Sequence, residues 1–198
     1  MKKSLFILTF FSAFILNSCD ILDQVSQVAM LSKCQFRLST LTNTKLAGVN
    51  VQNIDSFNDL SFVDVTKVTA AYATGNLPLS FTLNVEAKNP NTSAAGMSKL
   101  DWILLIDDLE VLTGITEQRI TIPANGGTAI LPLNLSFNLL KVIESRNVES
   151  LANFGMNLAG AGNRPTRVTL KAKPTIYVGS NPITYPNYIT IENEFTGI

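Results

Sequence analysis

Four acidic side chains lie close together in the middle of the sequence and form its only local cluster of carboxylates. They are Asp101, Asp107, Asp108 and Glu110. Paired carboxylates can act as general acid and base, and several together can bind a hard cation such as Ca²⁺. Their spacing matches no calcium loop, and Asp107-Asp108 falls between two apolar runs, where Asp is favoured in a turn. We therefore expect a hairpin turn there, with no catalytic residue, metal or cofactor.

Cys19 is the next candidate for chemistry, because it directly follows a segment that looks like an export signal. Lys2-Lys3 leads into an apolar run, Leu5–Leu16, which ends just before Ser18 and Cys19. A positive start, an apolar stretch of 7–15 residues and a small residue at the cut are typical of a secretory signal peptide. A run of about 12 residues is too short to span a bilayer core, which needs about 20. The sequence predicts a signal peptide over 1–18, cleaved between Ser18 and Cys19.

The residues at this cut resemble a bacterial lipobox. Leu16 stands three positions before Cys19 and the small Ser18 directly before it, while Asn17 departs from the usual small or hydroxyl residue. The resemblance implies lipidation of the Cys19 sulfur, with acyl chains such as palmitate, and two or more chains anchor a protein stably to a membrane. The alternative is an ordinary secretory signal followed by an incidental cysteine.

The chain contains no histidine. This removes Ser-His-Asp and Cys-His catalysis, histidine-bearing zinc sites and the usual general base near neutral pH. The second cysteine, Cys34, would be left alone if Cys19 is lipidated, so it could be reactive or pair between chains. Because Cys34 begins an alternating apolar and polar segment, we expect it to be a buried small hydrophobe in a strand. No enzyme activity is expected.

The composition fits one extracytoplasmic domain. Removal of residues 1–18 leaves 180 residues, enough for a single hydrophobic core. The removed segment carries two lysines and no acid, so the formal net charge falls from 0 to −2. Charged residues are 15 % of the chain, against about 25 % in typical domains. No basic patch interleaves with aromatic residues, so no nucleic-acid partner is expected.

Short alternating segments separated by turn residues dominate the rest of the chain. This pattern is typical of an all-β sandwich. We expect a lipid-anchored tether over 19–33 and one mainly β domain over 34–198, with one or two short helical insertions. The predicted strands are 35–42, 45–51, 79–88, 100–106, 109–113, 119–122, 128–135, 166–173, 175–178 and 188–194. Turns are predicted at Asn43-Thr44 and Asn181-Pro182, and Gly114 is predicted to end the strand over 109–113. Helical spacing predicts helices within 58–74, capped by Asp59 or Ser61 and ended by Gly75, and within 138–158.

The central block carries a family resemblance. A strand, Phe81–Lys88, ends in Asn89-Pro90-Asn91; it is followed by Leu100-Asp101-Trp102, Asp107-Asp108, Gly114, Ile122-Pro123, Gly126-Gly127 and Leu131-Pro132-Leu133. This series, over roughly residues 77–139, resembles the water-stress and hypersensitive-response domain of the type 2 late-embryogenesis-abundant (LEA14-like, desiccation-related) proteins. The resemblance implies an immunoglobulin- or fibronectin-III-like antiparallel sandwich and no catalytic residues.

The remaining candidate residues are interpreted structurally. Gly126-Gly127 and Gly160-Ala161-Gly162 lack the following Lys that a phosphate-binding loop needs, so they are predicted turns. Trp102 lies in an apolar run and is expected in the core, in a strand buried on both sides. The tail tyrosines could form a carbohydrate or peptide surface, although edge packing is favoured; they are Tyr177, Tyr185 and Tyr188.

We therefore expect a non-catalytic lipoprotein of the cell envelope with a LEA14-like role in stress or desiccation. The alternative is a binding or docking subunit of an envelope assembly, and a hydrolase using the acidic cluster is the third reading. The expected partners are membrane lipid, through acylated Cys19, and an unidentified envelope protein. The outer membrane is favoured over the inner, although Asp20 resembles an inner-membrane retention cue of some bacteria.

Overall fold

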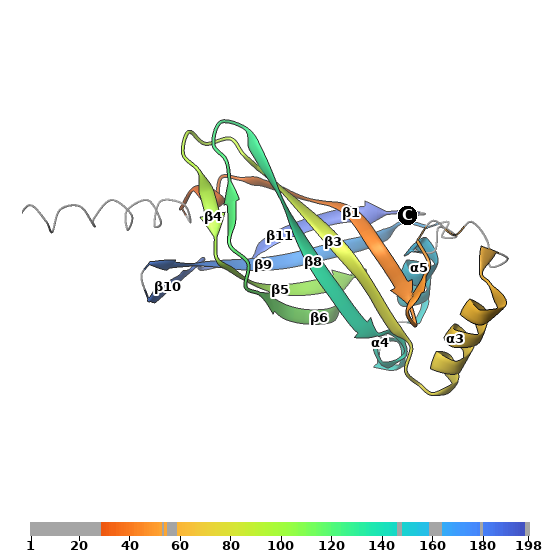
Figure 1. Ribbon diagram of the computed structural model, residues 1–198. Coiled ribbons are helices and arrows are strands. Elements are labelled where there is room, and N and C mark those ends of the chain that lie inside the picture. The colour runs from red at the N-terminus through yellow and green to blue at the C-terminus, as the bar shows by residue number, and fades with distance from the viewer. Residues whose placement is uncertain are drawn as a thin grey trace, which may run out of the picture.

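The structure is a two-layer antiparallel β-sandwich with short helices, which confirms the predicted fold class (Figure 1). The computed structural model describes residues 29–52, 54, 59–145, 148–158, 164–178 and 180–196. The predicted signal peptide and the Ser18–Cys19 cut lie outside these residues. The described chain begins with a helical turn at residues 29–31, and Leu31 is only 2 % exposed, so packing against the sandwich begins within the segment interpreted as a tether.

The first sheet has the strand order β2-β1-β3-β8. β3 is its centre, and β1 and β8 pair along almost its whole length. The alternation predicted for the β3 segment is confirmed, since Phe81, Leu83 and Val85 are buried while Ser80 and Asn84 lie on the other face. The strands are β1 (Gln35–Leu46), β2 (Val49–Asn50), β3 (Pro78–Asn89) and β8 (Gly127–Asn138).

The second sheet is built around β9, which pairs with β5 on one side and with β10 and β11 on the other. A separate pair, β4 and β7, lies at one end of the sandwich (Figure 1). The strands are β4 (Ala95–Met97), β5 (Lys99–Ile106), β6 (Leu109–Thr116), β7 (Ile120–Ile122), β9 (Thr166–Val178), β10 (Asn181–Thr184) and β11 (Ile189–Phe195).

Inward-facing side chains of the two sheets form one continuous hydrophobic core. Burial of this apolar surface is the main force that holds the layers together. Phe154 of α5 (Val148–Leu158) is fully buried and meets Phe81 edge-on, with ring centroids 5.7 Å apart. The predicted helical region within 138–158 is therefore confirmed as α4 (Leu139–Ser145) followed by α5, and α5 closes one end of the core.

The other predicted helix is α3 (Phe62–Ala73). Ser61 caps it by accepting a hydrogen bond from the Asp64 backbone N–H, at 3.2 Å, and Gly75 with φ +70° follows its end, as predicted. No residue of α3 is buried, although Val68 and Ala71 pack partly against the core. The helix lies at the end of the sandwich opposite β4, near the start of β3 (Figure 1).

Two predicted turns are wrong. β1 continues through Asn43-Thr44 by means of a bulge, with Asn43 at φ +57°, and the chain turns only at Ala47-Gly48, where both φ values are positive. β1 stays paired with β3 on both sides of Asn43-Thr44, because a bulge accommodates the extra residues without ending the strand. Asn181-Pro182 lies within β10, where Pro182 pairs with Tyr177. Proline is tolerated there because β10 is an edge strand.

Three predicted strand features also need correction. β6 runs through Gly114, which was predicted to end it. β5 is buried on one face only, since Leu100, Trp102, Leu104 and Ile106 are buried and the residues between them are half-buried. β9 is one strand rather than two, and it passes through Pro174. The Pro174 carbonyl accepts a bond from the Tyr185 N–H, at 2.8 Å, so the missing proline donor faces this side and the pairing with β5 is kept.

Candidate functional site

The acidic cluster is divided in the structure. Asp107 and Asp108 form the two-residue β5–β6 turn, both with positive φ, which confirms the predicted hairpin turn. Asp107 exchanges hydrogen bonds with Arg167: its Oδ1 accepts the backbone N–H, and its own N–H donates to the carbonyl, both at 2.9 Å. Asp108 forms an ion pair with the Arg167 guanidinium. The two carboxylates thus fix the start of β9 to this turn.

The other two carboxylates lie elsewhere. Asp101 pairs with Lys99, at 3.2 Å, and is six residues from Asp107 along β5, which is roughly 20 Å. Glu110 is exposed on β6. Within the described ranges, no group of three or more Cys, Asp or Glu side chains is placed to hold a metal ion. The arrangement assigns structural roles to three of the four carboxylates.

Of the two cysteines, Cys34 lies within the described residues and Cys19 lies outside them. Cys34 is a free thiol immediately before β1 and is half-buried rather than fully buried. Its Sγ donates a weak hydrogen bond to the Met30 carbonyl, at 3.6 Å, and it packs against the core. Burial raises the pKa of the Cys34 thiol, which keeps it protonated and lowers its reactivity near neutral pH.

The aromatic candidates take mainly structural positions. Trp102 is 7 % exposed in the core, as predicted, and its indole N–H donates to Thr116 Oγ1 at 3.0 Å. Tyr188 lies under the Lys173 ammonium, 5.6 Å from the ring centre. Tyr177 is 44 % and Tyr188 45 % exposed, and Tyr185 is half-buried between β10 and β11. Gly126 has φ +82° in a confirmed turn, whereas Gly160 and Gly162 lie outside the described residues.

The Asn-Pro turn after β3 holds a buried polar centre. Asn89 is fully buried, and its amide donates to the carbonyls of Ser93 and Ile122, at 3.0 and 3.1 Å. Its Oδ1 accepts the backbone N–H of Asn91, and the Asn91 amide in turn donates to the Met30 carbonyl at 3.0 Å. The segment that carries the family resemblance therefore connects β3 to β7 and to the entering N-terminal chain.

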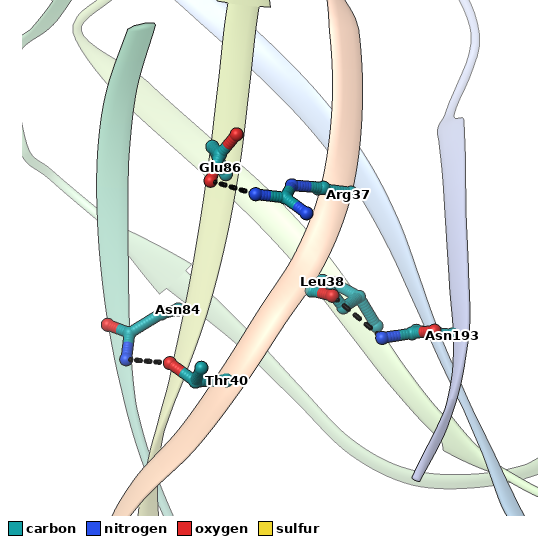
Figure 2. A network of polar contacts seen from close by, with 6 residues as sticks. All are labelled: Arg37, Leu38, Thr40, Asn84, Glu86 and Asn193. Atoms are coloured by element: carbon teal, nitrogen blue, oxygen red, sulfur yellow. Dashed lines mark hydrogen bonds and ion pairs between the residues drawn. The ribbon is translucent and has the colours of Figure 1, made fainter.

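Polar contacts on β1 join both sheets. Figure 2 shows Arg37 bound to Glu86 at 2.7 Å, Asn84 donating to Thr40 at 3.0 Å, and Asn193 of β11 donating to the Leu38 carbonyl at 2.9 Å. β1 has a bulge between Leu38 and Thr40, and at this level no strand among the described residues pairs with its side away from β3. The Asn193 side chain, from the second sheet, provides the hydrogen-bond donor that the Leu38 carbonyl lacks at this edge of the first sheet.

An open groove lies beside these contacts, on the outer face of the first sheet. It has a volume of about 340 Å³, within the range of small-ligand sites. Its polar lining is Asn43, Lys45, Ser80, Thr82, Asn134 and Ser136. Sequence reasoning missed this site, because the lining comes from three strands that are paired only in the folded chain. The one local signal was the run of Ser, Thr and Asn at the outward positions of β3.

No family model matches the chain, and no curated protein matches it. Among solved structures, it is similar to a crystal structure of a protein from Archaeoglobus fulgidus (15 % identity, TM-score 0.37, covering 79 % of this chain and 97 % of that one). It is also similar to the solution structure of AT1g01470 from Arabidopsis thaliana (14 %, TM-score 0.36, 60 % and 70 %). A third similar structure is that of At2g46140.1, provisionally described as a late embryogenesis abundant (LEA) protein (10 %, TM-score 0.37, 85 % and 79 %). Likenesses as distant as these say nothing about function.

Proposed function

We propose that the chain is a non-catalytic lipoprotein of the bacterial cell envelope, tethered through acylated Cys19, whose sandwich domain has a protective role under water stress. The predicted signal peptide and the Leu16-Asn17-Ser18-Cys19 motif support the tether. The resemblance of residues 77–139 to the LEA14-like domain supports the protective role. The domain is extracytoplasmic in this proposal, and the outer membrane is the favoured site.

The observation that carries the proposal is the Leu16-Asn17-Ser18-Cys19 motif at the end of the apolar run. The position of Leu31, twelve residues after Cys19, indicates how a tether there would meet the domain. Leu31 is buried between β4, β7 and the start of β1, and it lines an apolar gap there with Met97 and Ile122. Twelve residues span at most about 40 Å when fully extended. An anchor at Cys19 would therefore hold the sandwich close to the bilayer, with its β4–β7 end nearest the lipid.

The buried polar atoms and the aspartates of the acidic cluster are held in structural hydrogen bonds and ion pairs, which supports a non-catalytic role. In the described part of the chain, every buried side-chain nitrogen or oxygen has a hydrogen-bond partner. Asp107, Asp108 and Asp101 are engaged with Arg167 and Lys99, as described above. Groups engaged in structural pairs are poor candidates for proton transfer, which needs a group free to bind and release a proton at the substrate.

The proposal is tested by survival of cells after drying. A strain lacking the gene is complemented with the wild-type chain or with Cys19→Ser, which removes the lipidation sulfur. We expect the deletion to lower survival, the wild type to restore it and Cys19→Ser to fail at equal expression. If the deletion leaves survival unchanged, the protective role is contradicted. If Cys19→Ser restores survival fully, the tether is not needed for that role.

One observation favours the alternative, a docking subunit of an envelope assembly. α3 exposes Phe62 at 86 %, Val65 at 45 % and Tyr72 at 64 %, at the end of the sandwich opposite β4 (Figure 1). Exposed clusters of large apolar side chains are typical of protein contacts. Affinity purification from membranes tests this function. A partner retained by the wild type and lost with Phe62→Ser and Tyr72→Ser would favour it, whereas recovery of the chain alone would count against it.

A further inference from the structure

The groove on the outer face of the first sheet is formed by three neighbouring strands. Lys45 of β1, Ser80 of β3 and Ser136 of β8 occupy one row across the sheet. Thr82 and Asn134 lie side by side in the next row. Five of the six polar lining residues thus come from two adjacent rows, so they form one continuous floor rather than scattered surface groups, and Phe81 and Leu135 complete the lining.

The bulge in β1 adds the sixth polar group to this floor. In a regular strand, successive side chains point to opposite faces. The register shift between Thr42 and Lys45, with Asn43 at φ +57°, places Thr42 and Asn43 on the same outer face: Asn43 donates to Thr82 Oγ1, at 3.4 Å, and Thr42 accepts from Asn84, at 3.3 Å. Bulges of this kind commonly redirect a side chain toward a site.

A chain of hydrogen bonds orients the amides in the groove. Asn43 donates to Thr82, and Thr82 donates to Asn134 Oδ1 at 2.8 Å. Asn134 therefore accepts within the protein and keeps its NH₂ group for a ligand, while Asn43 keeps its carbonyl oxygen. The groove thus offers a fixed donor, the Asn134 NH₂ group, and a fixed acceptor, the Asn43 carbonyl oxygen, on opposite sides of the Thr82 hydroxyl. This arrangement suits a ligand whose groups both donate and accept hydrogen bonds.

The other lining groups are free and include one positive charge. Lys45, Ser80 and Ser136 make no side-chain hydrogen bond or ion pair with any residue that the structure describes. No carboxylate among those residues lines the groove. Glu86, six residues along β3 and so roughly 20 Å from Ser80, is already bound to Arg37. An unpaired ammonium without a competing acid favours an anionic ligand.

We propose that this groove binds a glycan through a sugar unit that carries an acidic group. Sugar hydroxyls match the hydroxyl and amide groups of Ser80, Asn134 and Ser136, and the acidic group would pair with the Lys45 ammonium. A small inorganic anion would satisfy Lys45 but leave most of a groove of about 340 Å³ to water. The site goes beyond the proposed function, because nothing in it depends on the tether.

The test is calorimetric titration of the full-length protein in detergent with a trisaccharide of galacturonic acid. The neutral trisaccharide of galactose and inorganic phosphate are titrated separately. We expect the acidic sugar to bind at least tenfold more tightly than either, because one charge-assisted hydrogen bond is worth about a factor of ten. Absence of binding, equal binding of the neutral sugar or equal binding of phosphate would each overturn the proposal.

Variants locate the binding. Lys45→Met, and separately Asn134→Ala, are expected to weaken binding of the acidic sugar about tenfold. Both side chains are exposed, so the fold should survive, which circular dichroism checks. The matched control is Lys88→Met, which removes an exposed lysine on the same face at the far end of β3. Equal weakening by Lys88→Met would mean general charge attraction and would overturn the assignment of the groove. Because no membrane is needed, the result is independent of Cys19 acylation.

Discussion

The indole ring of Trp102 lies against Gly114, its direct partner across the β5–β6 pair, so closely that no side chain fits between them. A Cβ on Gly114 would come within 2.3 Å of Trp102 Cζ2 and within 3 Å of two further ring atoms. Gly114 therefore does not interrupt β6; it makes room for the largest side chain in the core. The glycine and the tryptophan of the family-like segment are two parts of one packing contact.

Substitution of Gly114 by Ala should lower stability. The added methyl group must displace a ring that is 7 % exposed, and overpacking of this kind typically costs about 1–3 kcal/mol. Urea unfolding measures the loss as a lower midpoint at unchanged slope. Thr113→Ala, at the exposed neighbouring position, is the matched control and should cost less. An unchanged midpoint for Gly114→Ala would contradict the packing.

Asn138 connects the end of β8 to two other segments, the loop before β3 and the first turn of α4. Its Oδ1 accepts the backbone N–H groups of Leu77, at 3.2 Å, and Leu140, at 3.1 Å, while its amide donates to the Gly75 carbonyl at 3.0 Å. Asn138→Ala should cost about 1–3 kcal/mol, because these backbone groups lose their partner. Asn138→Asp keeps the acceptor oxygen and loses only the amide donor. Its urea midpoint should therefore lie between those of the wild type and Asn138→Ala. Equal midpoints for all three chains would contradict this role.

The Arg37–Glu86 pair should make stability depend on acid pH. The hydrogen bond from Arg37, aided by its charge, lowers the pKa of Glu86 below the ordinary value, while partial burial opposes the shift. A carboxyl group with a lowered pKa stabilises the folded state above its unfolded-state pKa, so the contribution is complete above about pH 5 and is lost as pH falls through the lowered value.

Arg37→Met tests this pair directly. In this variant the Glu86 pKa, followed by NMR of its side-chain carboxyl carbon, should rise toward the ordinary value. Lys88→Met removes only a weaker attraction by a neighbouring charge and should raise the pKa less. Because Arg37 is largely exposed, added salt should weaken the effect. An unchanged Glu86 pKa in Arg37→Met would mean that the pair does not form in solution.

Cys34 should react slowly in the folded protein. Burial raises the pKa of its thiol, and only the thiolate is nucleophilic. In a Cys19→Ser background, where Cys34 is the only cysteine, alkylation by iodoacetamide at pH 8 should be several-fold slower in buffer than in concentrated urea. Equal rates in both would show that Cys34 is open to solvent, which would favour the reactive-thiol alternative.

The parts of the fold that depend on local pattern could be predicted from the sequence. β3 alternates apolar and polar residues without interruption, and Asp107-Asp108 supplies two residues that tolerate positive φ in a hairpin turn. Ser61 and Gly75 mark the ends of α3 in the same local way. These features need only a few neighbouring residues, so one sequence is enough to find them.

The errors arose where a distant strand decides the conformation. Asn43-Thr44 has turn residues, yet pairing with β3 carries the chain through it as a bulge. Gly114 was interpreted as a strand end, because nothing nearby in the sequence shows that Trp102 packs on it. The groove follows the same rule: Lys45 and Ser136 are 91 residues apart and meet in one row only because β3 lies between their strands.

A lipid anchor on Cys19 would fix the mass of the mature amino terminus, so measurement of that mass decides whether the chain is anchored there. The protein is extracted from membranes, digested, and its first peptide is identified by mass spectrometry. We expect a chain that begins at Cys19 and carries diacylglyceryl on the sulfur, and we expect Cys19→Ser to leave the signal peptide uncleaved and the chain unlipidated. A mature chain with unmodified Cys19, or one that begins at any other residue, would contradict this anchor.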